Sequence, residues 1–311
     1  MPHPQPFAAP PWPPSPALID ALAALRWLRI EFVQVPLDDL MLPEHSGHLW
    51  RSVLLARLKI RRGCILKELQ RRSGKGKTVN LWALEPPTVE SVVPAGTPLA
   101  GSVVLFDEAM SHVGEVLGAL HDFEHQGLGL HRHYVPMQLV KFAVTGVPGT
   151  AGGPEGPLDA WRLMDAAAQE AEAIGPAAVQ MQLLTPTDFT DDNRSLRHAP
   201  SFARLLHFGH RRLADLVPAD LPGGLFAPGE AESWQAWAAT VGLAYDATRF
   251  TESQRFSRSQ QGEVPLRGLC EQAAYTAPAA WSWPWLRLFE HLQLGKKVTH
   301  GQGVVRFRSL G

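Results

Sequence analysis

The sequence predicts an α+β protein made of two tandem ferredoxin-like domains, each ending in a glycine-rich loop and a strand. The length of 311 residues suits two domains. The first half follows the order strand, helix, strand, strand, helix, strand, which is the ferredoxin-like order. The second half repeats the ending of the first, with a helix, a glycine-rich turn and a final strand. This internal repeat indicates that the two halves share the same arrangement of secondary-structure elements.

Changes in composition set the expected domain boundaries. Eight prolines among the first 16 residues predict a polyproline-like or disordered tail over residues 1–17. Residues 146–157 contain five glycines and three prolines and are expected to form a linker. The N-terminal domain is therefore expected over residues 18–145 and the C-terminal domain over residues 158–311.

The elements of the N-terminal domain follow from local patterns. Apolar and polar residues alternate over 25–35, which predicts the first strand. Ser46 is a favourable N-cap residue, and an apolar stripe continues from it to about residue 70, which predicts a helix. The remaining expected elements are a basic loop over 71–78, strands over 79–84, 99–106 and 134–144, a helix over 107–123 and a glycine-rich turn over 126–130.

The C-terminal domain shows the same elements less clearly. Apolar runs predict strands, and a period close to that of the α-helix predicts helices. The expected strands lie at 179–184, 234–245, 264–275 and 304–307, the expected helices at 201–216 and 281–292, and the glycine-rich turn at 295–303.

Charge and cysteine content exclude several classes of protein. The net charge of −1 argues against a protein that coats nucleic acid or membrane with its whole surface. Cys64 and Cys270 form neither a metal-type C-x-x-C pair nor a disulfide framework. Neither a signal peptide nor a transmembrane run is evident, so we expect a cytoplasmic protein with no membrane partner.

One segment departs from this neutral balance. Residues 59–77 contain eight basic residues and one acid, Glu68, a net charge of +7. Such a run is either a solvated helix face or a contact for a phosphate backbone, and the sequence favours neither. The candidate RNA-binding residues in and just after the expected helix are Arg61, Arg62, Arg71, Arg72, Lys75 and Lys77.

Two other patterns point to chemistry that the spacing does not support. Gly76-Lys77-Thr78 resembles the end of a phosphate-binding P-loop, but the glycine required five positions earlier is Arg71. Histidines cluster at positions 121, 125, 131 and 133, whereas a zinc site needs three or four converging ligands. We therefore expect no metal, and a metal-dependent hydrolase built on these histidines stays as an alternative.

The start of the first helix carries a more useful group of residues. His45 and His48 flank Gly47, and Arg51 lies three residues after His48, on the same helix face. The positive end of a helix lowers the pKa of a histidine, which favours the neutral imidazole that a general base requires. A nearby arginine stabilises negative charge that develops on a phosphate. A capping or core-edge histidine is the alternative interpretation.

The order and spacing of several segments resemble the CRISPR-associated RNA-processing endoribonucleases of the repeat-associated mysterious protein (RAMP) superfamily. The terminal glycine-rich loop is the most specific of them. After the Arg-Ser-Arg-Gln-like stretch, where the family usually has a paired glycine, Gly262 and Gly268 stand apart. The matching segments are 42–51, 127–129, 184–186 with 200–202 and 211–213, 255–260 and 294–303.

This resemblance implies two RRM-like domains that bind the repeat of a precursor CRISPR RNA, often a stem-loop, and cleave it without a metal or cofactor. The upstream 2′-hydroxyl would attack the scissile phosphate, leaving a 2′,3′-cyclic phosphate and a 5′-hydroxyl. The implied partners are precursor and mature CRISPR RNA and other effector-complex subunits. The alternative is a RAMP subunit that binds RNA without cleaving it.

The resemblance also guides the assignment of roles. His48 is the expected general base with His45 as its substitute, and Arg51 is the expected charge stabiliser. The loop is expected to hold phosphates through its lysines and through backbone N–H groups that glycines leave accessible. Further expected RNA-binding residues are Gly295, Lys296, Lys297, Thr299, His300, Gly301, Gly303, Arg255 and Arg258.

Overall fold

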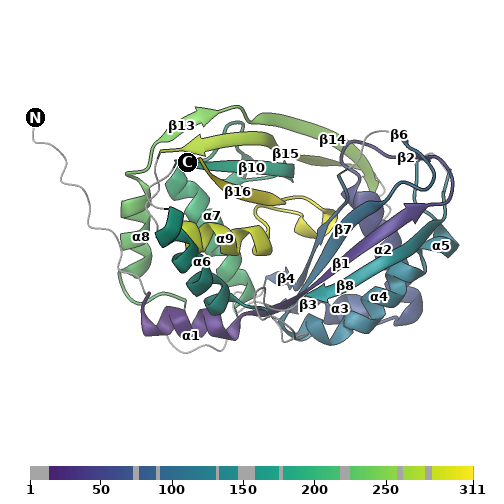
Figure 1. The fold of residues 1–311 in the computed structure, drawn as a ribbon, viewed down its shortest axis with the longest axis horizontal. Helices are drawn as coiled ribbons and strands as arrows, with labels where there is room; N and C mark the ends of the chain where they lie inside the picture. The colour runs from purple at the N-terminus through teal and green to yellow at the C-terminus, as the bar shows by residue number, and fades with distance from the viewer. Residues whose placement is uncertain are drawn as a thin grey trace, which may run out of the picture. The chain divides into compact units, whose positions relative to one another are not determined.

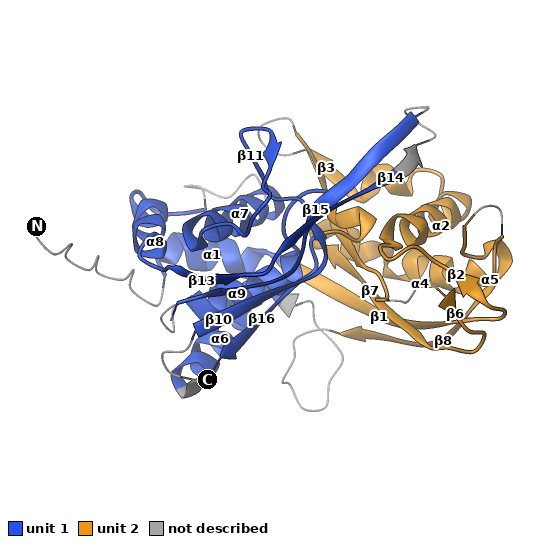
Figure 2. Ribbon diagram, turned by 90° about the horizontal axis from the view of Figure 1, so that it is seen from above, with its two compact units in different colours: residues 1–25, 159–296, 303–311 blue, residues 26–158, 297–302 orange. Residues whose placement is uncertain are grey.

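The computed structural model describes residues 14–72, 77–88, 92–130, 133–145, 158–174, 178–217, 225–257, 262–276 and 282–310. The chain divides into two compact units (Figure 2). Unit 1 comprises Met1–Leu25, Asp159–Lys296 and Gly303–Gly311, and unit 2 comprises Arg26–Leu158 and Lys297–Gln302. The segment before Arg26 thus groups with the C-terminal half, and residues 297–302 group with the N-terminal half.

Unit 2 contains an antiparallel sheet in the order β5-β7-β1-β8. Strands β7, β1 and β8 of this sheet are labelled in Figure 1. Its strands are β1 (Arg26–Pro36), β5 (Trp82–Glu85), β7 (Leu99–Phe106) and β8 (Met137–Thr145). Strand β1 pairs with β7 on one side and with β8 on the other. The first and last strands therefore lie side by side, as the order strand, helix, strand, strand, helix, strand requires in a ferredoxin-like domain.

Helices α2 (Gly47–Arg61) and α4 (Val113–His121) supply the helical layer of unit 2. The Phe32 ring on β1 lies 5.7 Å from the Trp50 ring on α2, and Trp50 stacks on Phe123 at 5.6 Å. The buried Gln34 side chain donates a hydrogen bond of 2.7 Å to the Leu120 carbonyl. The ring contacts fix α2 against the sheet, and the Gln34 hydrogen bond fixes α4. The smaller elements of unit 2 are β2 (Leu40–Met41), α3 (Ile65–Glu68), β3 (Gln70–Arg72), β4 (Thr78–Asn80), β6 (Val92–Val93), η1 (Asp107–His112), α5 (Phe123–Gln126) and η2 (Val298–His300).

The expected helix over 46–70 is too long. It ends at Arg61, because Arg62 adopts an extended backbone conformation, and the chain then forms α3 and β3. The expected loop over 71–78 includes strand residues instead, since β3 pairs with β4.

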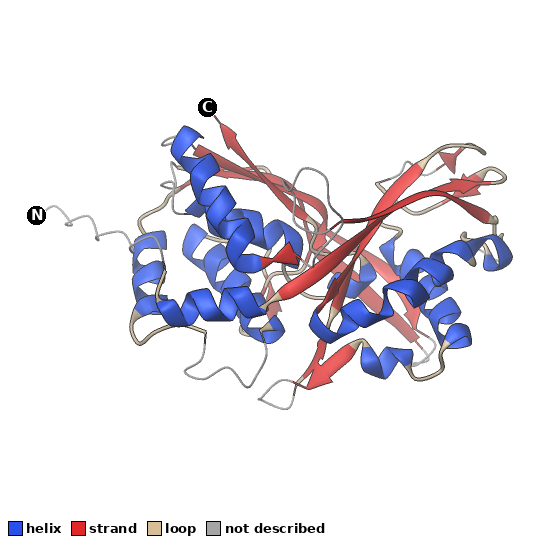
Figure 3. Cartoon of the chain, turned by 60° about the horizontal axis from the view of Figure 1, so that its bottom comes forward, coloured by secondary structure: helices blue, strands red, loops and turns tan. Residues whose placement is uncertain are grey.

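Unit 1 contains a second antiparallel sheet in the order β13-β15-β10-β16. Its strands are β10 (Ala178–Thr187), β13 (Leu243–Asp246), β15 (Gly262–Tyr275) and β16 (Val305–Leu310). Helices α7 (Phe202–Leu216) and α9 (Ser282–Leu292) complete the second ferredoxin-like order. The predicted fold class of two tandem ferredoxin-like domains is therefore confirmed. The additional elements are α1 (Pro16–Ala24), α6 (Ala160–Ile174), β11 (Thr190–Asp191), β12 (Arg194–Ser195), α8 (Glu230–Ala238) and β14 (Arg249–Ser257), and Figure 3 shows the helices and strands by colour. The short strand β9 (Leu158–Asp159) pairs with β1 and is the fifth strand of the unit 2 sheet.

One sequence prediction in unit 1 is wrong. The segment predicted as a strand over 234–245 begins within helix α8, where Trp234, Trp237 and Ala238 are buried at helical spacing. Helix α1 starts at Pro16, because the Ser15 hydroxyl accepts a hydrogen bond from the Leu18 N–H, so it overlaps the tail expected over 1–17 by two residues. Residues 1–13 and the linker 146–157 lie outside the described residues.

None of the helices in the described ranges combines the length and apolar character needed to cross a membrane.

Candidate active site

The first turn of α2 packs directly against residues 297–302, which come from the other end of the chain. A Cβ atom on Gly47 would lie 2.3 Å from the His300 carbonyl oxygen and 2.9 Å from the Gly301 Cα. Gly301 has a φ of +76°, and a Cβ atom there would lie 2.8 Å from the Pro86 side chain. Glycine is required on both sides because any side chain would separate the two segments.

This contact brings the predicted catalytic residues beside the predicted RNA-binding loop. His48 and Arg51 are half-buried in the first turns of α2, and the His48 carbonyl accepts a hydrogen bond of 2.8 Å from the Ser52 hydroxyl. The His45 side chain is 22% exposed, and its Nε2 lies 3.9 Å from a Glu44 carboxylate oxygen. The turn of α2 is thus a polar, partly open site and not part of the apolar core.

Within unit 2, the loop residues have distinct roles. Lys297 has a left-handed backbone (φ 63°) and precedes η2. Thr299 is 3% exposed, and its hydroxyl lies 3.5 Å from the Nδ1 of the half-buried His300. Gly301 is buried as well. The structure therefore gives Thr299 and Gly301 a packing role.

The flanking residues of unit 1 hold the start and end of the loop. Gly295 (φ +80°) faces the Asp188 carbonyl at 2.9 Å from its ideal Cβ, and Gly303 (φ +84°) would place a Cβ 1.9 Å from the Leu294 carbonyl oxygen. The exposed Lys296 donates its backbone N–H to the Asp188 carbonyl at 3.2 Å. These two glycines are therefore required by close backbone packing.

Asp188 is a residue that the sequence analysis missed. It is 3% exposed, and one carboxylate oxygen accepts hydrogen bonds from Ser195 at 2.6 Å and Thr190 at 3.2 Å. Through its carbonyl it also holds Lys296 in place. A single acid after a strand has no local sequence pattern that marks it as functional. Pro86, which contacts Gly301, is likewise not marked by any local pattern.

Much of the basic segment over 59–77 is neutralised by acids. Arg61 makes two hydrogen bonds of 2.7 Å to Asp122, and these lower the pKa of that carboxyl below its ordinary value. Arg71 donates to Asp107 at 2.8 Å. The exposed Arg72 and Lys77 are the better candidates for a phosphate contact in this segment.

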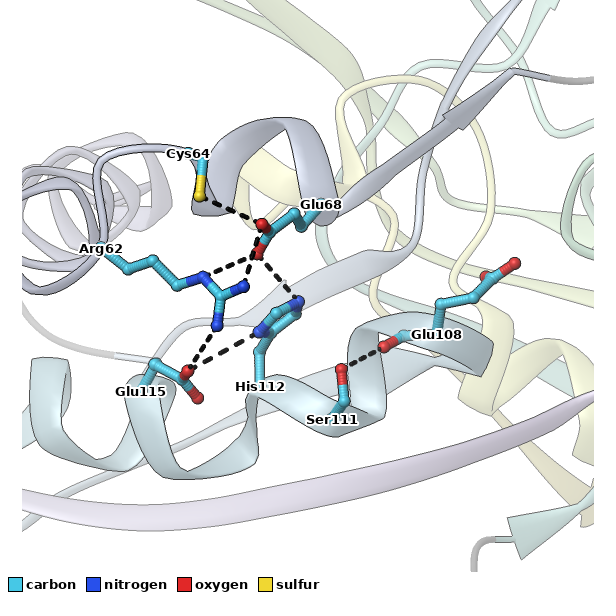
Figure 4. A network of polar contacts seen from close by, with 7 residues as sticks. All are labelled: Arg62, Cys64, Glu68, Glu108, Ser111, His112 and Glu115. Carbon is cyan, nitrogen blue, oxygen red and sulfur yellow. Dashed lines mark hydrogen bonds and ion pairs between the residues drawn. The ribbon is translucent and has the colours of Figure 1, made fainter.

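Arg62 belongs to the network drawn in Figure 4. Its guanidinium contacts Glu68 at 2.9 Å and Glu115 at 3.5 Å. Buried His112 lies between the same two carboxylates, 3.4 Å from Glu68 and 3.8 Å from Glu115. A hydrogen bond from the Cys64 thiol, followed by one from Arg62, lowers the pKa of Glu68. This network joins the α2–α3 turn to α4 and has a structural role.

Several predicted residues are not tested by these contacts. Lys75 and Arg258 lie outside the described residues, and only the backbone of Arg255, on β14, is described. In the part of the chain that the structure describes, no group of three or more His, Cys, Asp or Glu side chains is arranged to hold a metal ion. His131 is not among the described residues, so the alternative metal cluster is described only in part.

Several solved structures share the fold of this chain. Thermus thermophilus Cas6 is 14% identical, with a TM-score of 0.55 over 92% of this chain and 100% of that chain. A Cas6 product complex gives 15% identity and a TM-score of 0.55 over 91% of this chain and 100% of that chain. A partial Cas6-RT-Cas1–Cas2 complex gives 10% identity and a TM-score of 0.59 over 92% of this chain and 46% of that chain. The fold is therefore that of the Cas6 proteins.

The sequence of the C-terminal half carries the family signal. Residues 181–305 match the family model of the CRISPR-associated endoribonuclease Cas6. No curated relative matches the chain. The matched range includes the glycine-rich loop over 294–303, so the resemblance inferred from the sequence motifs is confirmed.

Proposed function

We propose that this protein is a metal-independent endoribonuclease that cleaves precursor CRISPR RNA within the repeat. The observation that carries the proposal is the contact between Gly47 and residues 297–302, which brings two histidines and an arginine beside a glycine-rich loop. The Cas6 family match over 181–305 supports the same activity. Acting on transcripts, the protein would work in the cytoplasm.

In the proposed reaction, the upstream ribose 2′-hydroxyl attacks the scissile phosphate. His48 takes the proton of that hydroxyl, with His45 as the substitute, and Arg51 stabilises the negative charge of the phosphorane. An acid protonates the 5′-oxygen, so the products are a 2′,3′-cyclic phosphate and a 5′-hydroxyl. Acid–base assistance of this kind contributes ~10²–10⁴-fold to the rate.

Lysines and arginines would hold the RNA backbone. Lys296 is exposed and anchored through its backbone, so its ammonium is available to a phosphate. Lys297, Arg72 and Lys77 add to this charge, and Arg255, Arg258 and Lys75 are further proposed contacts. Arg61, Arg62 and Arg71 have smaller proposed roles because they pair with acids.

The test is cleavage of the repeat RNA encoded beside this gene, with EDTA present. We expect cleavage in EDTA, and we expect His48→Ala to slow single-turnover cleavage by ~10²-fold or more, or His45→Ala to do so where His45 is the base instead. Wild-type rates in both variants would contradict the assignment of the base. His125→Ala is the matched control, because His125 is exposed on α5. Loss of cleavage in EDTA with recovery in zinc would contradict the metal-free reaction.

A second outcome would identify the alternative function. Tight binding of the repeat RNA without any cut product, in the wild-type protein, indicates a non-catalytic RAMP subunit that holds one end of a CRISPR RNA. Retention of the cleaved repeat end by an active enzyme would be consistent with both a nuclease and an effector-complex subunit.

A further inference from the structure

A cavity of about 390 Å³ opens on the unit 2 sheet and is separate from the histidines of α2. Its lining comes from β1, β5, β7, β8 and the segment that follows β5. Successive side chains of a strand point to opposite faces of a sheet. Because Phe32 packs on Trp50 of α2, its neighbours Glu31 and Val33 on β1 face away from the helix. The cavity therefore lies on the face opposite α2, and its volume is within the range of ligand pockets.

The polar lining of the cavity combines cations with carboxylates. The Arg29 guanidinium is bonded to Glu85 and lies 3.7 Å from Glu31. The Ser102 hydroxyl lies 3.4 Å from the same Glu85 carboxylate. Lys141, from the neighbouring strand β8, is exposed and lines the cavity. The side chains of Arg29 and Glu85 are only 15% and 18% exposed, so their positions are fixed by packing before any ligand arrives.

The cavity lies next to the candidate active site. Pro86 lines the cavity, and the same side chain lies against Gly301 of the glycine-rich loop. Gly301 in turn lies against Gly47 at the start of α2. The cavity and the start of α2 are therefore linked by two close contacts, Pro86 with Gly301 and Gly301 with Gly47.

We infer that this cavity binds one unpaired nucleotide of the RNA close to the cut site. The inference rests on the proposed function. Specific recognition of RNA uses single-stranded bases that leave the helix and place their edges against polar groups. Here the held carboxylate of Glu85 accepts hydrogen bonds from the amino or imino groups of a base, and Ser102 adds a hydroxyl. Lys141 neutralises the phosphate of that nucleotide.

The cavity gives the protein a means of selecting its substrate that differs from catalysis. The glycine-rich loop and its lysines hold phosphates and carry no base sequence information. A pocket with fixed donors and acceptors discriminates between bases, because a wrong base leaves buried polar groups unpaired. The nucleotide in this cavity is therefore expected to be a position at which base changes in the repeat weaken binding.

The test is a double-mutant cycle in which a base of the RNA and a side chain of the protein are removed singly and together, and the dissociation constant is measured for each combination. The probe is the repeat RNA with a 2′-deoxy sugar at the attacking nucleotide, so that it is not cleaved, and each unpaired position is made abasic in turn. At one position near the cut, we expect base removal to weaken wild-type binding about tenfold. In Glu85→Gln and in Ser102→Ala, the same base removal should change binding less than about twofold, because the group that reads the base is gone.

Lys141→Ala should weaken binding of every probe, because it removes a phosphate contact. Lys59→Ala is its matched control, since Lys59 is an exposed lysine of α2 that does not line the cavity. Thermal melting shows whether each variant is folded, and Ser102→Ala decides the question if Glu85→Gln unfolds. An equal effect of base removal in wild type and in both variants, at every position, would overturn the inference.

Cleavage of the all-ribose repeat is measured separately. If wild type does not cleave but the binding cycle shows the coupling, the nuclease proposal is wrong and the nucleotide pocket stands. If wild type cleaves and no coupling is found, the pocket is wrong and the nuclease proposal stands.

Discussion

Replacing Gly47 with alanine tests whether the contact between α2 and the glycine-rich loop forms the active site. The added Cβ atom would lie 2.3 Å from the His300 carbonyl oxygen. A carbon atom approaches a carbonyl oxygen to about 3.3 Å even in close contacts. The loop would therefore have to move by about 1 Å, the difference between these two separations.

Such a displacement has two expected effects. Overpacking of this kind destabilises a protein by ~1–3 kcal/mol. A shift of about 1 Å between reacting groups slows catalysis by ~10²-fold. We therefore expect Gly47→Ala to remain largely folded and to lose most of its single-turnover cleavage of the repeat RNA.

The control for this variant is Gly114→Ala in α4. A Cβ atom at Gly114 meets nothing within 4 Å, so alanine has room there. This variant should gain ~0.5–1 kcal/mol of stability from helix propensity and cleave at the wild-type rate. Urea unfolding and cleavage are measured on both variants. Wild-type cleavage and wild-type stability in Gly47→Ala would refute the reasoning, because the loop would then not be held by this contact.

Three further predictions follow from individual side chains. His210 is buried against Trp285, and burial lowers its pKa to about 3. In the unfolded chain its pKa is about 6.5. The free energy of unfolding is therefore greatest above pH ~6.5 and falls by ~1.4 kcal/mol per pH unit as the pH drops toward 3. His210→Leu should flatten this dependence in urea unfolding at pH 7.5 and 5.5, and an unchanged slope would contradict the assignment. Lys296→Ala should weaken binding of every RNA sequence, because it removes a phosphate contact. A salt titration should show that the slope of the logarithm of the binding constant against the logarithm of salt concentration falls in magnitude by about 1. An unchanged slope would show that this lysine makes no phosphate contact. Arg61→Ala should alter RNA binding less than Lys296→Ala and lower stability by only ~0.2–1 kcal/mol, because the Arg61 side chain in its pair with Asp122 is 37% exposed. A loss of affinity matching that of Lys296→Ala would contradict its structural role.

Strands of the first sheet were predicted more accurately from the sequence than several of the helices. Strand β7 has the predicted bounds 99–106, and β1 differs by one residue at each end, since the alternating pattern of a half-buried strand is local. Helices α1 and α6 were not predicted, and α8 was predicted as a strand. By propensity, the two tryptophans of α8 are compatible with a strand as well as with a helix. Tertiary packing selects the helix, because it buries both side chains on one helix face.

The candidate site was predicted only in parts. His48 and the loop glycines drew attention through local motifs, but nothing local shows that Gly47 meets His300, because about 250 positions separate them in the chain. The acids that neutralise Arg61 and Arg71 are also distant in sequence. The net charge of +7 counted over residues 59–77 is therefore larger than the charge that this segment can offer to an RNA backbone. The cavity beside Pro86 draws on four strands and has no sequence signature.

The assignment of residues 297–302 to unit 2 has a consequence for the order in which the protein matures. A ribosome that has made residues 26–158 has produced every strand of the β5-β7-β1-β8 sheet and still lacks the segment that closes against Gly47. That segment begins 139 positions after Leu158. The histidines of α2 would thus wait for the synthesis of the C-terminal half before the proposed site is complete, so a chain stalled before Lys297 would hold the strands of the first sheet without the proposed site.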